Sequence, residues 1–462
     1  MPAPPFRRIL IANRGEIAVR VVRACERLGI ESVVAVSVAD RDSLAARIAT
    51  RAVCIGPAPA RESYLRPDVL VMAALGTGCE AIHPGYGFLS ERSAFSRLCR
   101  EKGVTFIGPS PEVIDAMGDK ISAIGCAERA GVPRVPGSGR IANAADARSF
   151  ARQHGYPVLV KASAGGGGRG MRVVRREEDV LRETDAAAAE ALAAFGDSTL
   201  YVEKFIERAR HIEIQVLGDS HGNVVHLGER DCSTQRRHQK LIEEAPSPAL
   251  DAHLRSELAE AAVRLASSVN YVGAGTVEFV FDDDTQRWYF LEMNTRIQVE
   301  HPVTEMVSGR DLVAEQIRIA AGEAISFTQD EIHIGGHAIE CRINAEDATR
   351  NFTPVPGRLQ TWIAPEGPGV RVDTHCFPGY LVPPYYDSLL AKVIAHGADR
   401  SEAIARMSEA LRRLEVVGVP TTAPFHRQVI AHDDFKAGRI TTRWVEQEFL
   451  ASGTGSIEKR NP

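Results

Sequence analysis

The stretch Glu292-Met-Asn-Thr-Arg-Ile-Gln-Val-Glu300, followed by His301-Pro302, carries the densest functional chemistry in the chain. If it is extended, each even position presents a carboxylate, an amide or a guanidinium to one face, while Met293, Ile297 and Val299 point the other way. An ordinary half-buried strand would carry Ser, Thr and Lys on that polar face. The pattern therefore predicts a strand through Glu300 whose polar face suits a metal ion, a phosphate and a small anion.

A β-hairpin is predicted to deliver this strand. Residues 275–281 and 288–292 read as strands, joined by the polar turn 282–287. A hairpin with its tip at residue 285 places Glu278 directly opposite Glu292. Opposed carboxylates repel one another in a bare sheet, and a divalent cation between them relieves the repulsion. We therefore expect Mg²⁺ at this pair, with Asn294 as a third oxygen donor, and expect the aspartates 282–284 to be solvated at the turn.

Composition excludes several classes of protein. With 462 residues, 44% hydrophobic and 25% charged, the chain is long enough for two or three cores and is neither disordered nor membrane-spanning. A net charge of −5 gives no general attraction for nucleic acid. The start lacks a long apolar targeting segment, so we expect a cytoplasmic protein. The eight cysteines show no Cys-x-x-Cys spacing, which predicts reduced, mostly buried thiols, Cys232 among them.

The pattern along the chain indicates three regions. Residues 7–12, 16–28 and 31–37 read as strand, helix and strand, without the glycine fingerprint of a dinucleotide site. The loop 81–91 follows an apolar strand and opens a helix near Ser90, which suits a ligand-facing connection. A helix begins at Ser110-Pro111, and a domain boundary is expected near 115–120. Strands and turns follow from 133, and the chain becomes strand-rich again from 331.

A glycine-rich segment is predicted to cover phosphates. Ala164-Gly-Gly-Gly-Gly-Arg-Gly170 lies between a strand ending near Lys161 and a strand that starts at Met171. The segment matches G-x-G-x-x-G, but a strand follows it and Gly-Lys-Ser/Thr is absent, which excludes the Rossmann and Walker interpretations. A hairpin flanked by Lys161 and Arg169 can fold over phosphates with backbone N–H groups as donors. The alternative is a floppy surface hairpin.

A second cluster is cationic, in Gln235-Arg-Arg-His-Gln-Lys240 beside a strand end. Such runs are usually solvated faces or nucleic-acid contacts. The acidic total and the lack of neighbouring basic helices favour a compact anion site. Together with Arg296 and Gln298, Lys240 would form an anion pocket beside Glu300, the natural base for an oxygen nucleophile in phosphoryl transfer.

Four motifs together resemble biotin carboxylase. They are Lys161-Ala-Ser-Ala-Gly-Gly-Gly-Gly-Arg-Gly-Met, Arg230-Asp-Cys-Ser-Thr-Gln-Arg-Arg-His-Gln-Lys, Glu292-Met-Asn-Thr-Arg-Ile-Gln-Val-Glu-His-Pro and Gly336-His-Ala-Ile-Glu-Cys-Arg-Ile-Asn-Ala-Glu. The resemblance extends from Ile11-Ala-Asn-Arg-Gly-Glu to beyond Pro383-Pro-Tyr-Tyr-Asp-Ser, nearly the whole chain.

The resemblance implies an α/β protein, α+β in part, with the ATP-grasp fold. Its domains would be a Rossmann-like N-terminal domain (1–116), an ATP-grasp domain (117–330) with a mobile glycine-loop lid (133–206), and a strand-rich C-terminal domain (331–462). The implied enzyme is an ATP-dependent ligase. ATP would phosphorylate bicarbonate to carboxyphosphate, and the carboxyl group would pass to N1′ of biotin.

The resemblance also implies roles residue by residue. Nucleotide contacts would come from Lys120, Lys161, Gly166, Gly167, Gly168, Met171, Glu203, Lys204, His211, Gln235 and His238, with Glu203 and Lys204 at the adenine. Glu278, Glu292 and Asn294 would hold two Mg²⁺ ions, for which Mn²⁺ can substitute. Bicarbonate would be held by Lys240, Arg296, Gln298 and Val299 and deprotonated by Glu300. Arg342 would stabilise the biotin enolate, and Tyr86, Gly87 and His238 would line the ureido site.

The expected partners follow from the same family. A carrier domain needs a biotinylated lysine in an Ala-Met-Lys-Met setting, and none of the seven methionines is followed by lysine. We therefore expect biotin to arrive on a separate biotin carboxyl carrier protein, unless the chain is a fragment. A carboxyltransferase, a homodimer, and a place in an acyl-CoA carboxylase such as the acetyl-CoA carboxylase of fatty acid biosynthesis are implied. Nucleic acid and membranes are not expected.

Departures from the family pattern are few. Ala164 precedes four glycines where some relatives have a fifth, and Val417-Gly-Val-Pro-Thr-Thr differs from the usual Gly-Ile-Lys-Thr-Asn. Two alternatives are a carboxyphosphate-forming synthetase or ligase that uses an amine, and a regulatory subunit that binds nucleotide without hydrolysis. The first has no use for Arg342 or the 81–91 loop. The second would lack at least one of Glu278, Glu292, Arg296 or Glu300, and all four are present.

Overall fold

The computed structural model describes residues 4–162, 171–195 and 197–451. The chain divides into two compact units, which are described separately. The first comprises Met1–Val132, Arg210–Phe279 and Leu291–Pro462, and the second Pro133–Ala209 and Val280–Phe290. Among the helices of these described residues, none combines the length and apolarity needed to cross a bilayer. The three domain ranges expected from the sequence stay a prediction.

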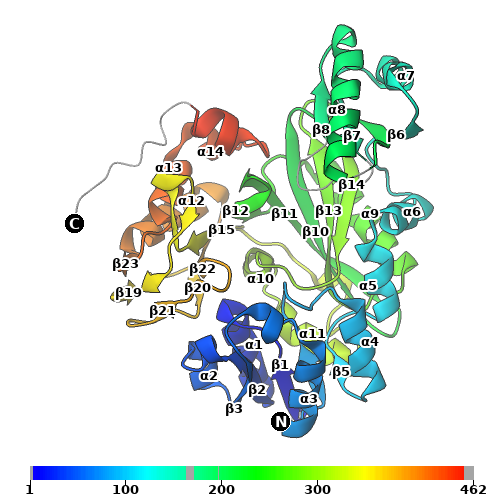
Figure 1. The fold of residues 1–462 in the computed structure, drawn as a ribbon. Coiled ribbons are helices and arrows are strands. Elements are labelled where there is room, and N and C mark those ends of the chain that lie inside the picture. Colours follow the sequence, from blue (N-terminus) through cyan, green and yellow to red (C-terminus); the bar gives the residue numbers. More distant parts are fainter. Residues whose placement is uncertain (1–3, 163–170, 196, 452–462) are drawn as a thin grey trace. The chain divides into compact units, whose positions relative to one another are not determined.

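The first unit begins with a five-stranded parallel sheet in the order β3-β2-β1-β4-β5 (Figure 1, blue to cyan). Alternate residues of β1 serve two cores, because successive side chains of a strand point to opposite faces. Ile9 and Ile11 pack with helix α1, whereas Leu10 packs with helices α3 and α4. This order and its two covered faces confirm the Rossmann-like prediction. The bounds are β1 Arg8–Ile11, β2 Glu31–Ser37, β3 Arg51–Gly56, β4 Ala81–His83, β5 Thr105–Phe106, α1 Gly15–Leu28, α2 Leu44–Ile48, α3 Pro67–Thr77 and α4 Ser93–Glu101.

Local signals fix the helices of this region. Helix α1 ends at Gly29, which adopts a left-handed conformation with φ 70°. Helix α4 starts at Ser93, three residues after the expected position. Ser110 caps α5 (Pro111–Gly118) by accepting a 3.3 Å hydrogen bond from the backbone N–H of Val113, as the sequence predicts. Helix α6 (Lys120–Arg129) follows directly, capped by Asp119.

An eight-stranded sheet forms the centre of the first unit, in the order β14-β13-β10-β11-β12-β15-β22-β20. It joins strands far apart in sequence, since β12 pairs antiparallel with β15 and β15 pairs with β22. Figure 1 shows these strands running side by side behind helix α10. The bounds are β10 Ala209–Gly218, β11 Val224–Arg236, β12 Gln239–Ala245, β13 Gly273–Asp282, β14 Arg287–Asn294, β15 His337–Asn344, β20 Val370–Thr374, β22 Leu389–Gly397, α9 Ala252–Ser268, α10 His301–Ser308 and α11 Leu312–Ala320.

A further core lies on the C-terminal side of this sheet. It contains Ile339, Val393, Met407 and Trp444, all buried. The helical tail expected from the sequence is present as α12 and the helices after it. The remaining bounds are β16 Glu346–Asp347, β17 Thr353–Pro354, β18 Gly357–Arg358, β19 Thr361–Ile363, β21 Leu381–Val382, β23 Glu415–Val417, α12 Arg400–Arg413, α13 Ala423–Ala431 and α14 Asp433–Lys436.

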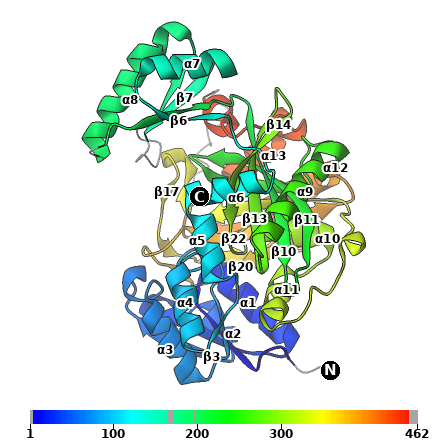
Figure 2. The same cartoon turned by 90° about the vertical axis from the view of Figure 1, so that its right-hand side faces the viewer.

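The second unit contains a four-stranded sheet in the order β6-β9-β7-β8. Helices α7 and α8 cover it (Figure 2), and the buried Val158 and Val160 of β7 pack with residues of both helices. The predicted strands on either side of the glycine segment pair antiparallel, Lys161 opposite Met171. The segment itself, 163–170, lies outside the described residues. The bounds are β6 Gly137–Ile141, β7 Val158–Ala162, β8 Met171–Val174, β9 Leu200–Lys204, α7 Ala144–His154 and α8 Val180–Phe195.

The prediction of a strand through Glu300 is wrong beyond Asn294, where β14 ends. From there the backbone finds other partners: the N–H of Thr295 donates to the carboxylate of Glu91, 3.2 Å away. Glu300 is the N-cap of α10, and Pro302 occupies the first turn of that helix. Proline is favoured there because its fixed φ suits a helix start, so the chain must leave the sheet before it.

Gly218, at the end of β10, permits a close approach that tests this packing. A Cβ added there would lie 2.1 Å from the backbone oxygen of Tyr271, which cannot move cheaply. Gly218→Ala should therefore destabilise the protein by about 2 kcal/mol or more, measured by denaturant unfolding.

Gly76 of α3 provides the matched control, because a Cβ there meets nothing within 4 Å. Gly76→Ala should stabilise the helix slightly, by about 0.5 kcal/mol. Equal stability of the two variants would contradict the close contact at Gly218.

Candidate active site

The side chain of Arg230, on β11, is completely buried at the centre of the site. A guanidinium has five N–H groups, and burial of a charge is costly unless it is paired and hydrogen-bonded. Each of the five groups finds an oxygen here. The acceptors are Glu213 at 2.5 Å and Gln215 at 2.8 Å on β10, Thr276 at 3.1 Å on β13, Gln298 at 2.7 Å and Thr304 at 2.9 Å.

Lys240, near the start of β12, lies among three carboxylates. Its Nζ donates to Glu213 at 2.6 Å, to Glu300 at 2.7 Å and to Glu278 at 3.0 Å. All three acids are buried, so the attraction is weakly screened by solvent. Lys240, Glu278 and Glu300, which the sequence assigns to one site, are thus brought together.

Glu278 is the meeting point of several donors. One of its oxygens accepts from Asn294 at 2.9 Å and from Gln298 at 2.7 Å, besides Lys240. The other lies 2.9 Å from Nε2 of His211. Burial opposes charge on both residues, but the attraction of opposite charges outweighs it. The pKa of Glu278 therefore falls well below its ordinary value, and the pKa of His211 rises to about 9.

The oxygen donors expected to hold Mg²⁺ fit a hard divalent cation. Strands β13 and β14 are neighbours, and partial burial followed by the charge of Glu278 raises the pKa of Glu292. A cation between the two acids would relieve this repulsion. Asn294 currently donates its amide to Glu278, and Arg296 donates to the oxygen of Asn294 at 2.8 Å. Protein cations thus balance the acids in this structure. A second cluster with metal-ligand geometry consists of His211, Glu213 and Glu278.

Glu300, the predicted base, lies between two cations. One oxygen faces Lys240, and the other accepts from Arg342 at 3.1 Å. Arg342 also donates to Glu243 at 2.6 Å. Burial would raise the pKa of Glu300, but the charges of Lys240 and Arg342 lower it to about 2. Glu300 is therefore a carboxylate at neutral pH, as a base must be.

Cys232 lies beside this acid as a structural thiol. Its Sγ is 3.9 Å from Glu300, and burial raises the pKa of the thiol well above its ordinary value. A protonated thiol in such a place is inert, as the sequence predicts. All eight cysteines are within the described residues, where each is free and all but Cys54 are buried.

The loop after β14 carries the remaining predicted bicarbonate residues. Gln298 is fixed by Arg230 and Glu278, as described above. Arg296 donates to Glu91 at 2.9 Å, and the backbone oxygen of Val299 accepts from Lys392 at 2.8 Å. The loop is therefore held at successive residues although it lacks regular secondary structure.

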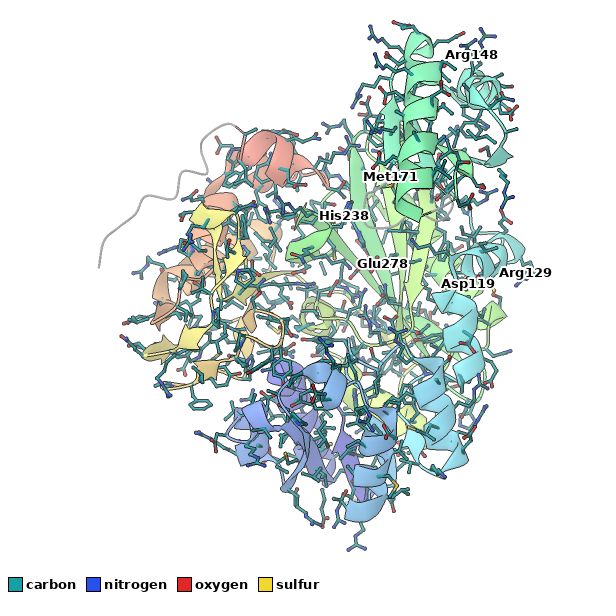
Figure 3. The ribbon with its side chains drawn as sticks, viewed as in Figure 1. Asp119, Arg129, Arg148, Met171, His238 and Glu278 are labelled. Atoms are coloured by element: carbon teal, nitrogen blue, oxygen red, sulfur yellow. The ribbon has the colours of Figure 1, made fainter. Side chains whose placement is uncertain are left out.

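Other predicted residues of the first unit lie around this centre. Gln235 is buried on β11, opposite Lys240 in the β11–β12 pair. His238 lies exposed at the tip of that hairpin with φ 63° (Figure 3), and Lys120 is exposed at the start of α6. For these three residues, nucleotide or biotin contact stays a prediction.

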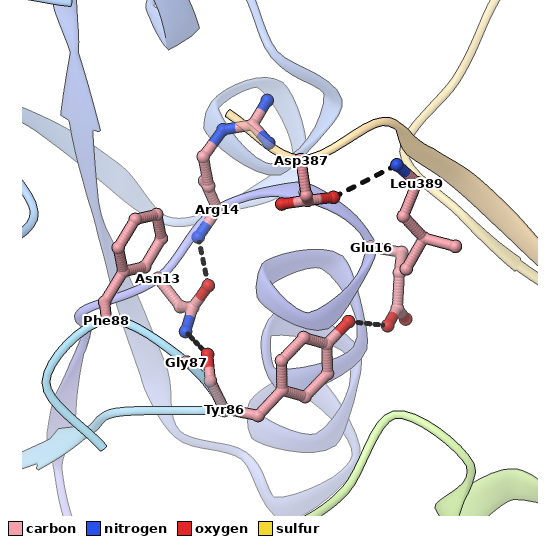
Figure 4. Close-up of a pocket in the computed structure, with 9 residues that line it drawn as sticks. Asn13, Arg14, Glu16, Tyr86, Gly87, Phe88, Asp387 and Leu389 are labelled. Atoms are coloured by element: carbon pink, nitrogen blue, oxygen red, sulfur yellow. Dashed lines mark hydrogen bonds between the residues drawn. The ribbon is translucent and has the colours of Figure 1, made fainter. Parts of the chain in front are cut away.

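Tyr86 and Gly87 line a cavity of about 130 Å³ (Figure 4). The hydroxyl of Tyr86 donates to Glu16, and its backbone oxygen accepts from Asn13 at 2.7 Å. Tyr86 itself is half-buried and Gly87 is exposed. The predicted biotin contacts are therefore accessible and firmly held.

In the second unit, the predicted nucleotide residues lie on its sheet. Lys161 forms an ion pair with Glu203 across β7 and β9, and Lys204 donates to the backbone oxygens of Gly155 and Tyr156, each 3.1 Å away. Met171 is exposed at the start of β8. Gly166, Gly167 and Gly168 lie outside the described residues.

The sequence analysis missed three charged residues of this centre, namely Glu213, Arg230 and Glu243. A signal for the first was present, since His211, Glu213 and Gln215 occupy alternate positions of one strand, and all three contact the site. Arg230 and Glu243 gave no comparable signal, because each stands in a run of mixed charges whose buried member only the sheet reveals.

The pKa of His211 gives a pH-dependent contribution to stability. A folded pKa of about 9 above the ordinary value of 6.5 means that the contribution is complete below about pH 6.5 and is lost as the pH rises through 9. The stability difference between the wild type and His211→Gln should therefore shrink by about 3 kcal/mol between pH 6 and pH 10, measured by urea unfolding.

His253 is the control because its side chain is 79% exposed. The difference between the wild type and His253→Gln should stay constant over this range. A constant difference for His211→Gln would contradict the ion pair with Glu278.

Comparison with known families adds independent evidence. Three family models cover most of the chain: the N-terminal domain of biotin carboxylase matches residues 5–114, the ATP-binding domain of the carbamoyl-phosphate synthase L chain matches 119–328, and the C-terminal domain of biotin carboxylase matches 340–447. Biotin carboxylase 1 of Bacillus subtilis is 54% identical over 442 residues, which cover 96% of this chain and 98% of that protein.

Solved structures agree with this. A biotin carboxylase from Campylobacter jejuni in complex with β-γ-ATP superposes with a TM-score of 0.87 at 48% identity, covering 95% of this chain and 98% of that one. The biotin carboxylase domain dimer of 2-oxoglutarate carboxylase from Hydrogenobacter thermophilus, bound to MgADP and bicarbonate, gives a TM-score of 0.86 at 49% identity, covering 96% of this chain and 97% of that one. The chain therefore belongs to the biotin carboxylase family.

Proposed function

We propose that the protein carboxylates N1′ of biotin, using ATP and bicarbonate. The observation that carries the proposal is the placement of Glu300 between Lys240 and Arg342. It sets a buried carboxylate base beside a lysine suited to bicarbonate and an arginine suited to an enolate. Membership of the biotin carboxylase family supports the same reaction.

The first step is phosphorylation of bicarbonate. Lys240, Arg296 and Gln298 hold the anion, and Glu300 takes its proton, so that the carbonate oxygen attacks the γ-phosphorus and ADP leaves. A bicarbonate ion that accepts from Lys240 would compete with Glu300 for that ammonium group. This loss of a positive charge raises the pKa of Glu300 and makes it a better base.

Nucleotide and metal binding are assigned as the sequence predicts. Glu278, Glu292 and Asn294 would hold Mg²⁺, or Mn²⁺ in its place, and the ions would supply charge neutralisation on the phosphates. Nucleotide contacts in the first unit would come from Lys120, His211, Gln235 and His238. Those in the second unit would come from Lys161, Glu203, Lys204, Met171 and the glycines 166–168. The related structures with bound β-γ-ATP and MgADP support this assignment.

The second step transfers the carboxyl group to biotin. Arg342 is 17% exposed while it contacts Glu243 and Glu300, so its guanidinium is within reach of both the base and a substrate. There it stabilises the enolate oxygen that makes N1′ nucleophilic. Tyr86 and Gly87 would contact the ureido ring.

The partners are a biotin carboxyl carrier protein and a carboxyltransferase, in an assembly built on a homodimer. The absence of a Met-Lys pair in the sequence and the reported domain dimer of the Hydrogenobacter thermophilus enzyme support these assignments. An acetyl-CoA carboxylase is one such assembly. A relative 51% identical, from the pyruvate carboxylase of Methanothermobacter thermautotrophicus, belongs with a different acceptor.

An ammonia-dependent synthetase is the second candidate, because the central region matches the carbamoyl-phosphate synthase model. The flanking regions match biotin carboxylase models instead, and Arg342 comes from the C-terminal one. We therefore expect biotin, and not ammonia, to accept the carboxyl group.

Biotin-stimulated ATP hydrolysis is the direct test. With Mg²⁺ and bicarbonate, the enzyme should hydrolyse ATP slowly, and free biotin should raise the rate. Glu300→Gln should lower the bicarbonate-dependent rate by roughly 10²- to 10⁴-fold, because the proton acceptor is lost. Phosphate release is the readout. Equal rates with and without biotin, or stimulation by ammonia instead, would refute the assignment.

Arg342→Ala separates the two steps. Removal of the guanidinium should lower biotin carboxylation by roughly 10²- to 10³-fold, because the enolate loses its counter-charge. Nucleotide affinity should change by less than about twofold. Incorporation of labelled bicarbonate into biotin and binding of ADP are the two measurements.

Arg427, exposed on α13, supplies the matched control. Arg427→Ala should preserve both carboxylation and ADP binding. A normal carboxylation rate in Arg342→Ala would contradict the role given to Arg342.

A further inference from the structure

Lys392, on β22, is a fully buried lysine outside the predicted site. Its Nζ lies 3.0 Å from Glu16 and 3.8 Å from Asp373, and it donates to the backbone oxygen of Val299 at 2.8 Å. In the sheet it stands opposite Arg342 on β15 and Asp373 on β20. A buried ammonium costs free energy unless its hydrogen bonds are met, so these partners define what Lys392 does.

The bond to Val299 reaches the predicted base. The carbonyl of Val299 belongs to the peptide that joins it to Glu300, and Glu300 is the N-cap of α10. Lys392 therefore fixes the orientation of the peptide from which the side chain of Glu300 projects. Gln298, one residue earlier, is held independently by Arg230 and Glu278.

The bond to Glu16 reaches the predicted biotin site. Glu16 is buried in the first turn of α1, and the same oxygen that faces Lys392 accepts from the hydroxyl of Tyr86. Figure 4 shows Tyr86 held at both ends, by Glu16 at the ring and by Asn13 at the backbone. The second oxygen of Glu16 is buried and finds no hydrogen-bond partner among the described residues. Glu16 is therefore committed to these two contacts.

We propose that Lys392 and Glu16 are positioning residues that hold Tyr86 and the Val299–Glu300 peptide in a fixed relation. The pair joins three segments that are distant in sequence: the first turn of α1, the loop after β4 and the loop before α10. One ammonium group thereby sets the distance between the biotin contact and the bicarbonate base. This inference rests on the proposed function, since it deepens the roles of Tyr86, Val299 and Glu300.

Lys392→Met tests the proposal, because it removes the charge and keeps an unbranched side chain. We expect the KM values for bicarbonate and for biotin each to rise roughly 10- to 100-fold, as small displacements of reacting groups do. The KM for ATP should change by less than about twofold. Lys102→Met is the matched control at an exposed position after α4, and it should leave all three constants unchanged.

A purely structural role predicts a different result. It would lower Tm and shift the three constants together. A folded Lys392→Met enzyme whose constants are unchanged, or shifted in common, overturns the proposal. If Lys392→Met does not fold, Glu16→Gln/Lys392→Met removes both charges of the pair and is judged by the same selective rise.

A double-mutant cycle with Tyr86→Phe tests the connection itself. Tyr86→Phe removes the hydroxyl that contacts Glu16. The effects of Tyr86→Phe and Lys392→Met on the KM for biotin should be non-additive by at least about threefold, because both act through Glu16. Additive effects overturn the connection. Failure of biotin to stimulate the wild type would refute the proposed function, whereas normal stimulation with additive effects would refute only the positioning role.

Discussion

The burial of Arg230 is the constraint on which the site depends. A guanidinium without solvent must direct all five N–H groups at oxygens, and removal of a partner from such a group typically costs about 3–5 kcal/mol. The acceptors come from β10, from β13, from the loop after β14 and from α10. One planar group therefore fixes two strands, a loop and a helix in register. The loop that carries the bicarbonate residues is rigid because of this, although it has no regular structure.

Charges of alternating sign extend from this centre. Glu213 contacts Arg230 and Lys240, Lys240 contacts Glu300, Glu300 contacts Arg342, and Arg342 contacts Glu243. Each acid is balanced by neighbouring cations, so the array is stable without ligands. The same balance explains how ligands of both signs can enter. A bicarbonate ion replaces a carboxylate as the partner of Lys240, and a divalent cation replaces Lys240 as the partner of Glu278. Binding thus exchanges partners and avoids the creation of a buried unpaired charge.

The sequence predicts the elements of this site better than its geometry. The hairpin strands around Glu278 and Glu292, the βαβ start and the strands flanking the glycine segment all follow from periodicity and turn residues. The continuation of β14 to Glu300 does not form, because Pro302 starts a helix and Glu91 takes the backbone N–H of Thr295. Glu213 and Glu243 could not be ranked above other acids, since their importance comes from partners on neighbouring strands. Side-chain period survives in a sequence, whereas the identity of the adjacent strand does not.

Strand order explains why the C-terminal region belongs to the chemistry. Strand β12 pairs with β15, and β15 pairs with β22, so Lys240, Arg342 and Lys392 come from three consecutive strands of one sheet. Neighbouring strands lie about 5 Å apart, a distance that a lysine or arginine side chain easily spans. The cation for bicarbonate and the cation for the biotin enolate can therefore contact the same Glu300 without any movement of the backbone. An ATP-grasp enzyme whose sheet ended at β12 would keep the residues for phosphorylating bicarbonate and would lose the arginine that directs the carboxyl group to biotin.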